Sequence, residues 1–299
     1  MTMEFLTLND AQAQTETKVG KLILQTAMHA SKLLQRMRWA ISDEDQFKYD
    51  QLLANLPIEA RPGDTVTMVS DQVVTKTVNL CQAVNKAYAQ DKGDALILEM
   101  IVDLAMDLER AALGNDDLFD LSPLGIVNLL DMRQRERAAR VVSGQDLDKL
   151  ISRLGKFWNP DTCVFLIASD LHRHLVKTCT AMRDTYRGAL VIPSNAYGFR
   201  RKIACVSLDP AHGLFGIGKG QLSNCPYRDV DDVQRPDFGR VLGWQIEDGI
   251  KEKANPKRPE EVRVADSDGM FKTVQISWFG AFALVNQNAA ASIEDLAGA

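Results

Sequence analysis

Residues 94–125 read D-A-L-I-L-E-M-I-V-D-L-A-M-D-L-E-R-A-A-L-G-N-D-D-L-F-D-L-S-P-L-G, a strongly periodic stretch of the chain. Apolar residues return every three or four positions, which predicts a long helix with one apolar stripe and one charged side. At about 1.5 Å per residue, a helix from Asp94 to Leu113 spans about 30 Å, and Gly114 is expected to end it in the left-handed conformation. We therefore expect a domain built against this helix. The helix itself is expected to be structural and to carry no catalytic residue. The stripe consists of Leu96, Ile97, Met100, Ile101, Leu104, Leu108 and Ala111, and the charged side of Glu99, Asp103, Asp107, Glu109 and Arg110.

Length and composition limit the classes of protein. The chain has 299 residues, of which 45% are hydrophobic, so it can form one large domain or two ordinary ones with a substantial core. The net charge is −5 and the Lys and Arg residues are spread along the chain, which argues against a broad surface that binds nucleic acid through its phosphates. The N-terminus shows no signal-peptide pattern, and no apolar run approaches about 18 residues, so we predict neither secretion nor a membrane span.

Two unusual segments precede the long helix. Residues 10–38 predict an exposed helix, capped by Asn9 or Asp10, whose single apolar stripe suits an arm lying on a partner. In residues 39–79 the helical period disappears, and two stretches rich in Thr and Val, 65–69 and 73–78, predict an extended two-stranded excursion. A lone hairpin is only marginally stable, so another part of the chain or another subunit is expected to cover it. The stripe of the arm consists of Val19, Leu22, Ile23, Ala27, Leu33, Leu34 and Met37.

Strands and helices alternate after the long helix. A charged run, Arg133 to Arg140, is interpreted as a solvated helix face rather than a phosphate-binding patch, because Glu136 interrupts it and no aromatic residue lies within it. A helix is expected from Asp146, a buried strand over 162–167 and another helix over 171–182, which together favour an α/β or α+β body.

The sequence pattern changes in the last third of the chain. Residues 188–249 contain short apolar pieces separated by Gly and Pro, which predict a loop-rich subdomain. Residues 274–285 form an apolar run that predicts a closing strand.

No motif for catalysis or cofactor binding emerges. Gly216-Ile217-Gly218-Lys219-Gly220 lacks the spacing and the following helix of a phosphate-binding loop. His172 and His174 would lie about 200° apart on their helix, a poor pair of metal ligands. We therefore predict no catalytic, cofactor-binding or metal-binding residue and no enzyme, although residues assembled from distant segments remain an open alternative.

The other candidate residues lack the partners that a site requires. The acidic cluster near residue 230 lacks the glycine and the distal glutamate of a calcium loop, the isolated histidines have no ligand companions nearby, and no serine lies in a G-x-S-x-G turn. The cysteines are far apart and form no C-x-x-C pair, so we interpret them as buried free thiols in a reducing cytoplasm. These residues are Asp229, Asp231, Asp232, His29, His212, Cys81, Cys163, Cys179, Cys205 and Cys225.

The order of these parts resembles the major capsid protein of tailed bacteriophages, which has the Hong Kong phage-type capsid fold. Three sets of residues carry the resemblance, each to a different part of that family: the extended loop, the end of the spine helix, and the final strand with its tail. They are Trp39-Ala40-Ile41 through Phe47-Lys48-Tyr49 to Leu56–Arg61, then Leu108–Asp116 with Leu124–Ile126, and finally Trp278–Asn286 with Ala289 and Ile293.

The resemblance implies an α+β fold with five parts. They are an N-terminal arm (1–38), an extended loop (39–80), a peripheral domain (81–187) with spine helix 94–113, an axial-type domain (188–250) and a return to the peripheral domain (251–299). It also implies self-assembly into pentamers and hexamers of an icosahedral virion shell, formed in the host cytoplasm around double-stranded DNA that is not bound sequence-specifically. Scaffolding, portal and decoration proteins are the implied partners, with no membrane.

The resemblance leaves some points open. A scaffold would have to be a separate protein or a piece already removed, and the lysine-to-asparagine crosslink of some relatives cannot be matched to residues here. Two other functions remain as alternatives. One is a cellular nanocompartment shell with the same fold, and the other is a soluble nucleotide-binding enzyme that uses Gly216 to Gly220.

Overall fold

The computed structural model describes residues 5–14, 18–42, 46–48, 65–67, 73–81, 91–114, 125–195, 199–219, 244–248 and 271–298. The helices are α1 (Leu8–Gln14), α2 (Lys18–Ala30), α3 (Lys32–Arg36), α6 (Asp91–Leu113), α7 (Ile126–Leu129), α8 (Gly144–Leu154) and α9 (Ser169–Thr178), with short 3₁₀ turns η1 (Met132–Gln134), η2 (Gly155–Phe157) and η6 (Gln287–Ala289). The strands are β1 (Trp39–Ser42), β2 (Gln46–Lys48), β3 (Thr65–Thr67), β4 (Val73–Cys81), β5 (Arg135–Arg137), β6 (Cys163–Ala168), β7 (Thr185–Tyr186), β8 (Ala189–Ser194), β9 (Ile203–Ser207), β10 (Leu214–Lys219), β11 (Trp244–Asp248), β12 (Phe271–Leu284) and β13 (Ala290–Glu294).

The long helix predicted over 94–113 is α6, which begins three residues earlier, at Asp91. The described part of its stripe, from Met100 to Ala111, is buried as expected, with Leu104 and Leu108 at most 1% exposed. Gly114 ends the helix at φ +87°, and its N–H donates to the carbonyl of Arg110 at 3.1 Å. One residue of the predicted charged side is wrong: Glu109 is buried, at 6% exposed, because α3 and β8 pack against that part of the helix.

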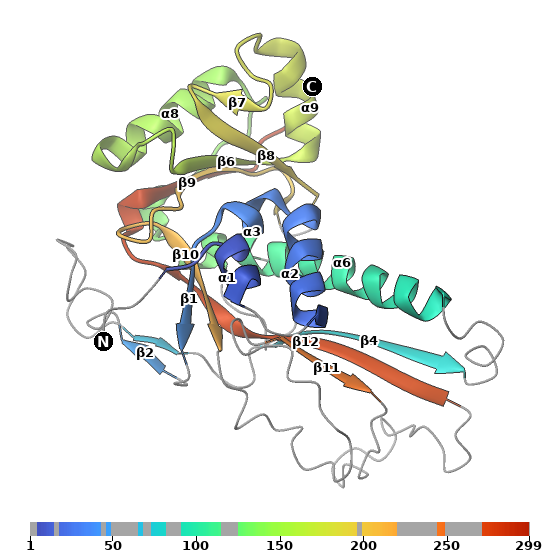
Figure 1. The fold of residues 1–299 in the computed structure, drawn as a ribbon. Helices are drawn as coiled ribbons and strands as arrows, with labels where there is room; N and C mark the ends of the chain where they lie inside the picture. Colours follow the sequence, from blue (N-terminus) through green and yellow to red (C-terminus); the bar gives the residue numbers. More distant parts are fainter. Residues whose placement is uncertain are drawn as a thin grey trace, which may run out of the picture.

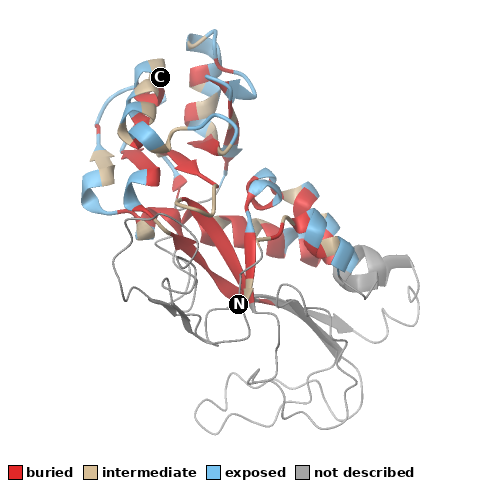
Figure 2. Cartoon of the chain, turned by 60° about the vertical axis from the view of Figure 1, so that its left-hand side comes forward, coloured by how far each residue is buried: buried red, intermediate tan, exposed pale blue. Residues whose placement is uncertain are grey.

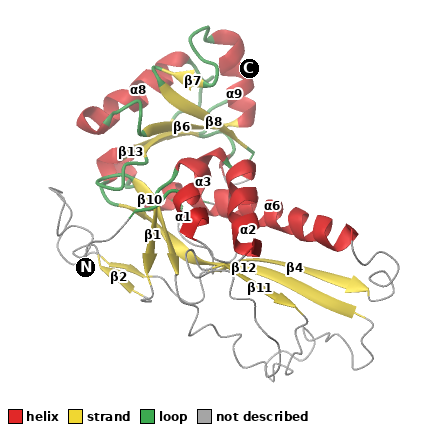
Figure 3. Ribbon diagram, viewed as in Figure 1, coloured by secondary structure: helices red, strands yellow, loops and turns green. Residues whose placement is uncertain are grey.

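A five-stranded sheet lies beside α6, with β12 at its centre (Figure 3). The predicted closing strand is β12, which pairs antiparallel with β10, β11 and β4. The strands predicted around 65–69 and 73–78 exist, but they do not pair with each other as the predicted excursion required. Instead β3 pairs with β2, while β4 pairs with β12 from Cys81–Phe271 to Val73–Phe279. The long strand β12 offers β4 a partner along its whole length, which a short hairpin does not.

A six-stranded sheet forms a second layer, in the order β5-β13-β9-β6-β8-β7 (Figure 1). Its central strand β6 is buried at every residue, which confirms the predicted buried strand. Helices α8 and α9, predicted from Asp146 and over 171–182, pack beside it, although α9 already ends at Thr178.

The boundary predicted between residues 187 and 188 falls inside this sheet. Strands β7 and β8 pair directly across it, whereas β10 belongs to the other sheet. The described strands of 188–250 are therefore shared between two sheets and do not form one loop-rich subdomain. Short apolar pieces reveal that strands exist but not which strands they join.

The charged run Arg133 to Arg140 is not a helix face. Asp131 caps the single turn η1 by accepting the N–H of Arg133, and β5 then pairs parallel with β13. Glu136 is the centre of an ion-pair network: its carboxylate accepts hydrogen bonds from Lys149 at 2.7 Å and Arg153 at 2.5 Å on α8. The run thus joins the sheet edge to the helix that covers it.

The N-terminal segment forms three short helices that pack on their own chain. Helix α2 contacts α6, and Ile23, Leu33 and Leu34 are fully buried in the main core (Figure 2). The interpretation of this stripe as an arm lying on a partner is wrong for its buried residues, although Leu22 of the same stripe is 37% exposed. Ser31 interrupts the predicted single helix, because its hydroxyl accepts the N–H of Leu34 and caps a new helix that folds back. The first helix is capped by Thr7 rather than by Asn9 or Asp10.

Candidate functional site

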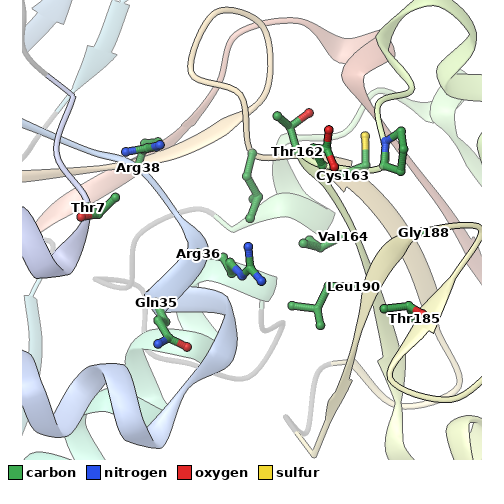
Figure 4. Close-up of a pocket in the computed structure, with 13 residues that line it drawn as sticks. Thr7, Gln35, Arg36, Arg38, Thr162, Cys163, Val164, Thr185, Gly188 and Leu190 are labelled. Carbon is green, nitrogen blue, oxygen red and sulfur yellow. The ribbon is translucent and has the colours of Figure 1, made fainter.

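A cavity of about 360 Å³ lies between the N-terminal helices and the six-stranded sheet (Figure 4). This volume is at the lower end of the range of small-ligand pockets. One wall comes from the end of α3, the residues that follow it and the cap of α1, and the other from β6, β7, β8 and the turn before β6. The lining residues are Thr7, Gln35, Arg36, Arg38, Pro160, Asp161, Thr162, Cys163, Val164, Thr185, Gly188, Leu190 and Leu208.

The sheet side of the cavity has an apolar floor, with the polar residues Asp161, Thr162 and Thr185 also in its lining. Val164 and Leu190 are register partners on β6 and β8, so their side chains stand on the same face of the sheet. Leu208, just after β9, adds to this face and is 6% exposed. The floor can therefore accept an apolar group but offers no catalytic side chain.

The opposite wall is cationic. Arg36 and Arg38 are both exposed; the backbone carbonyl of Arg38 accepts the N–H of Gly216 at 2.9 Å, and the positive charge of Arg38 acts on the carboxyl group of Asp10. Figure 4 places the Arg36 guanidinium in the middle of the cavity. Asp161 also lines the cavity and offsets part of this charge. The arrangement can hold a polar group against an apolar floor, and it has no paired acid and base for proton transfer.

Cys163 has the lowered pKa of a reactive thiol, but its side chain is nearly inaccessible to solvent. A hydrogen bond from the Cys205 thiol, followed by one from the backbone N–H of Asn159 at 3.4 Å, lowers the pKa of Cys163 to about 7. The side chain is 2% exposed and stands on the face of β6 opposite Val164, away from the cavity floor. Cys163, Cys179 and Cys205 are free; Cys163 and Cys205 are buried, as predicted, whereas Cys179 is only partly buried.

One polar cluster was missed by the sequence reasoning. The Ser207 hydroxyl lies 3.2 Å from Nε2 of His212, whose Nδ1 lies 3.9 Å from a carboxylate oxygen of Asp209. This order matches a serine–histidine–aspartate triad, but Ser207 is fully buried and 3.9 Å is too long for a hydrogen bond. The Ser207 hydroxyl accepts the N–H of Asp209 at 3.3 Å, so the cluster shapes the turn between β9 and β10.

The glycine-rich stretch is a strand rather than a phosphate loop. Residues 216–219 lie within β10, which pairs parallel with β1 and antiparallel with β12. A Cβ at Gly216 would lie 2.4 Å from the indole of Trp39, so the glycine is needed for aromatic packing. Gly220 lies outside the described residues. The feature on which the nucleotide-binding alternative depended is thus part of the core.

The remaining candidates do not form a site in the part of the chain that the structure describes. His172 and His174 lie on α9, and burial lowers the pKa of His172. No group of three or more potential metal ligands occurs in the described ranges. His29 is exposed on α2, and Asp229, Asp231 and Asp232 lie outside the described residues. Among the described helices, none is long and apolar enough to cross a membrane.

No protein-family model and no curated protein matches the sequence, but solved structures match the fold. The SrpI encapsulin of Synechococcus elongatus, in a holo complex, is 15% identical over 89% of this chain and 87% of its own, with a TM-score of 0.60. A virus-like particle from Pyrococcus furiosus is 10% identical over 91% and 96%, with a TM-score of 0.57. The procapsid of satellite phage P4 is 11% identical over 95% and 93%, with a TM-score of 0.53. The chain has the Hong Kong phage-type capsid fold, an α+β fold, as the resemblance in its sequence predicted.

Proposed function

We propose that the protein is a subunit of a closed shell, in which many copies assemble into pentamers and hexamers with icosahedral symmetry. The observation that supports this proposal is the agreement of the fold along about nine tenths of the chain with an encapsulin, a virus-like particle and a phage procapsid. These three are particles of different origin, and the fold is what they share with this chain. The function is then assembly rather than catalysis.

The described elements suggest a revised division of the subunit. We assign α6, the N-terminal helices and the five-stranded sheet to the peripheral part, and the six-stranded sheet with α8 and α9 to the axial part. The axial part then begins near Asp131, just after α7, rather than at residue 188, and it includes β13 at the C-terminus. Within residues 39–80, β1 and β4 belong to the five-stranded sheet, so we keep the assignment as an extended loop only for the segment between these two strands.

The finer proposal is the major capsid protein of a tailed phage, which encloses double-stranded DNA. A phage procapsid and the capsids of gene transfer agent particles have the same fold as this chain, the latter with TM-scores of 0.52 and 0.54. A net charge of −5 suits a lining that does not hold packaged DNA tightly. Scaffolding, portal and decoration proteins are then the partners, and the virion is the location.

A second candidate is the shell of a cellular nanocompartment with a protein cargo. The TM-score of 0.60 with the SrpI encapsulin exceeds the 0.53 with the phage procapsid, which favours this candidate. The contents of purified particles separate the two candidates. Nuclease-resistant double-stranded DNA identifies a phage capsid, whereas a stoichiometric enzyme without DNA identifies a nanocompartment.

Sedimentation tests the shell proposal itself. The full chain is expressed alone and together with the products of its neighbouring genes, and each lysate is run on a sucrose gradient. A shell sediments far ahead of a 33.2 kDa monomer in a narrow band. Protein that stays at the top of the gradient in both expressions would reject the proposal.

A further inference from the structure

Glu109 is a buried carboxyl group at the meeting point of three elements. It lies on α6 and is 6% exposed. The hydroxyl of Ser194, the last residue of β8, lies 3.3 Å from its Oε1, within hydrogen-bond distance. The side chain of Ser31, which caps α3, also hydrogen-bonds with it. One carboxyl group therefore joins the long helix to the N-terminal helices and to the six-stranded sheet.

The charge on this carboxyl group is poorly compensated. Arg110, on the same helix, is the only charged group among the described residues that acts on it, and this arginine already pairs with Asp107 at 2.8 Å. The groups that face Glu109 from α3 and β8 are the neutral hydroxyls of Ser31 and Ser194. Burial raises the pKa of Glu109, and the hydrogen bonds from the two serines lower it by less. Two neutral donors do not replace the water that a buried carboxylate loses.

Ser31 and Ser194 connect the protonation state of Glu109 to α3 and to β8. The Ser31 hydroxyl also accepts the N–H of Leu34 at 3.2 Å, so its position sets the first turn of α3. Ser194 pairs with Ala168 in the register of β8 and β6, so its position is tied to the centre of the six-stranded sheet. A change in the protonation of Glu109 therefore alters contacts both at α3 and at the six-stranded sheet.

We propose that Glu109 is a proton-dependent latch, which holds the N-terminal helices and the six-stranded sheet firmly to α6 when it is neutral and loosens this junction when it is charged. The sign follows from the direction of the pKa shift. Because the pKa is higher in the folded chain than its ordinary value of 4.5, the neutral carboxyl stabilises the fold fully below that value. This contribution is lost as the pH rises through the folded pKa. The inference concerns the subunit alone, so it does not depend on what the subunit builds.

The test compares the pH profiles of wild type and Glu109→Gln as purified full-length chains at equal concentration. Melting temperatures between pH 4.5 and 8 should show wild type losing stability relative to the variant as the pH rises. Each unit by which folding raises the pKa changes the folding equilibrium about tenfold at high pH, which corresponds to about 3 °C for a chain of this size. Glu99→Gln is the matched control, because Glu99 is exposed on the same helix, and it should follow wild type.

A second variant keeps the proposal testable if Glu109→Gln does not fold. Ser194→Ala removes one donor to the charged carboxyl and should steepen the loss of stability with pH. Hydrogen exchange, corrected for intrinsic rates, should show amides of α3 and β8 opening more readily at pH 7.5 than at pH 5 in wild type. The proposal is overturned if Glu109→Gln keeps the wild-type slope, if Ser194→Ala leaves the slope unchanged, or if those amides show no dependence on pH.

Discussion

Adding a single methyl group at Gly216 tests whether the glycine-rich stretch is core or ligand loop. Gly216 on β10 is the register partner of Trp39 on β1, and a Cβ there would lie 2.4 Å from two ring carbons of the indole. Trp39 is 1% exposed and packs edge-on against Trp278 and Phe282, with ring centroids 6.0 and 6.3 Å away. The ring therefore has little room to move, and β10 or β1 must shift by about 1 Å to restore an ordinary contact of about 3.4 Å.

The expected loss of stability can be worked from these contacts. Overpacking of a tight core costs about 1–3 kcal/mol, whereas replacing glycine with alanine in a strand returns about 0.5–1 kcal/mol. Gly216→Ala should therefore destabilise the chain by about 1–2 kcal/mol. The offending atoms belong to the six-membered ring of the indole, so Trp39→Phe should remove most of the clash. The two changes together should cost less than the sum of each alone, by about 1 kcal/mol.

Urea unfolding followed by circular dichroism measures these differences without depending on tryptophan fluorescence. Gly298→Ala is the matched control, because its Cβ would meet nothing closer than 3.5 Å, and it should change stability by less than about 0.5 kcal/mol. The packing argument is refuted if Gly216→Ala is as stable as wild type, or if its effect simply adds to that of Trp39→Phe. A nucleotide that stabilises wild type but not Gly216→Ala would instead support the alternative of a phosphate-binding loop at Gly216 to Gly220.

Four further predictions concern the helices and the sheet edge. Leu34→Ala, at a fully buried position, should lower the free energy of unfolding in urea by about 2–5 kcal/mol. Leu22→Ala, at a position 37% exposed, should lower it by less than about 1 kcal/mol. Equal losses would contradict the packing of the N-terminal helices on their own chain. Deletion of residues 1–38 should abolish cooperative unfolding, not merely assembly. Ser143→Ala should cost about 1 kcal/mol, because Ser143 and Asp146 form the capping box of α8, and an unchanged urea midpoint would argue against that cap. The hydrogen bond from Lys149 holds the pKa of Glu136 below its ordinary value of 4.5, so Glu136→Gln should destabilise at pH 7, and this loss should shrink as the pH falls below 4.5 and through the folded pKa. A difference from wild type that stays constant down to the acid limit of the folded state would refute the ion-pair network.

Local periodicity predicts individual elements well in this chain. The apolar stripe of α6 and the continuous apolar run of β6 need only neighbours in sequence to be recognised, and both were found close to where they were expected. Gly114 was identified as the end of α6 because a glycine follows the last apolar residue, and its positive φ confirms that interpretation. The fold class followed from the order of such elements.

Contacts between distant segments could not be read in the same way. The stripe that includes Ile23 and Leu34 looks alike whether its partner is the same chain or a neighbour, so the arm was assigned to the wrong partner. The partner of β4 is β12, about two hundred residues away, and no local signal marks that pairing. Glu109 was placed on the charged side because helix position shows which residues share a face, but not what covers it.

The polar clusters show the same limit. Ser207, Asp209 and His212 are close in sequence, yet only the turn after β9 brings their side chains together. The spacing of these residues matches no common motif, and the burial of Ser207 distinguishes a turn from an active site. The cavity beside Arg36 is lined by residues of two segments, 7–38 and 160–208, that are far apart in the sequence. It could therefore be found only in the folded chain.

Negative-stain electron microscopy of the purified full-length protein tests the central claim most directly, because a shell is visible without knowledge of its contents. The protein should be imaged after expression alone and after expression with the products of its neighbouring genes. A shell subunit should give closed particles of uniform diameter, accompanied by rings of five and six where closure is incomplete. Only monomers or dimers in both preparations, from protein that unfolds cooperatively, would contradict it.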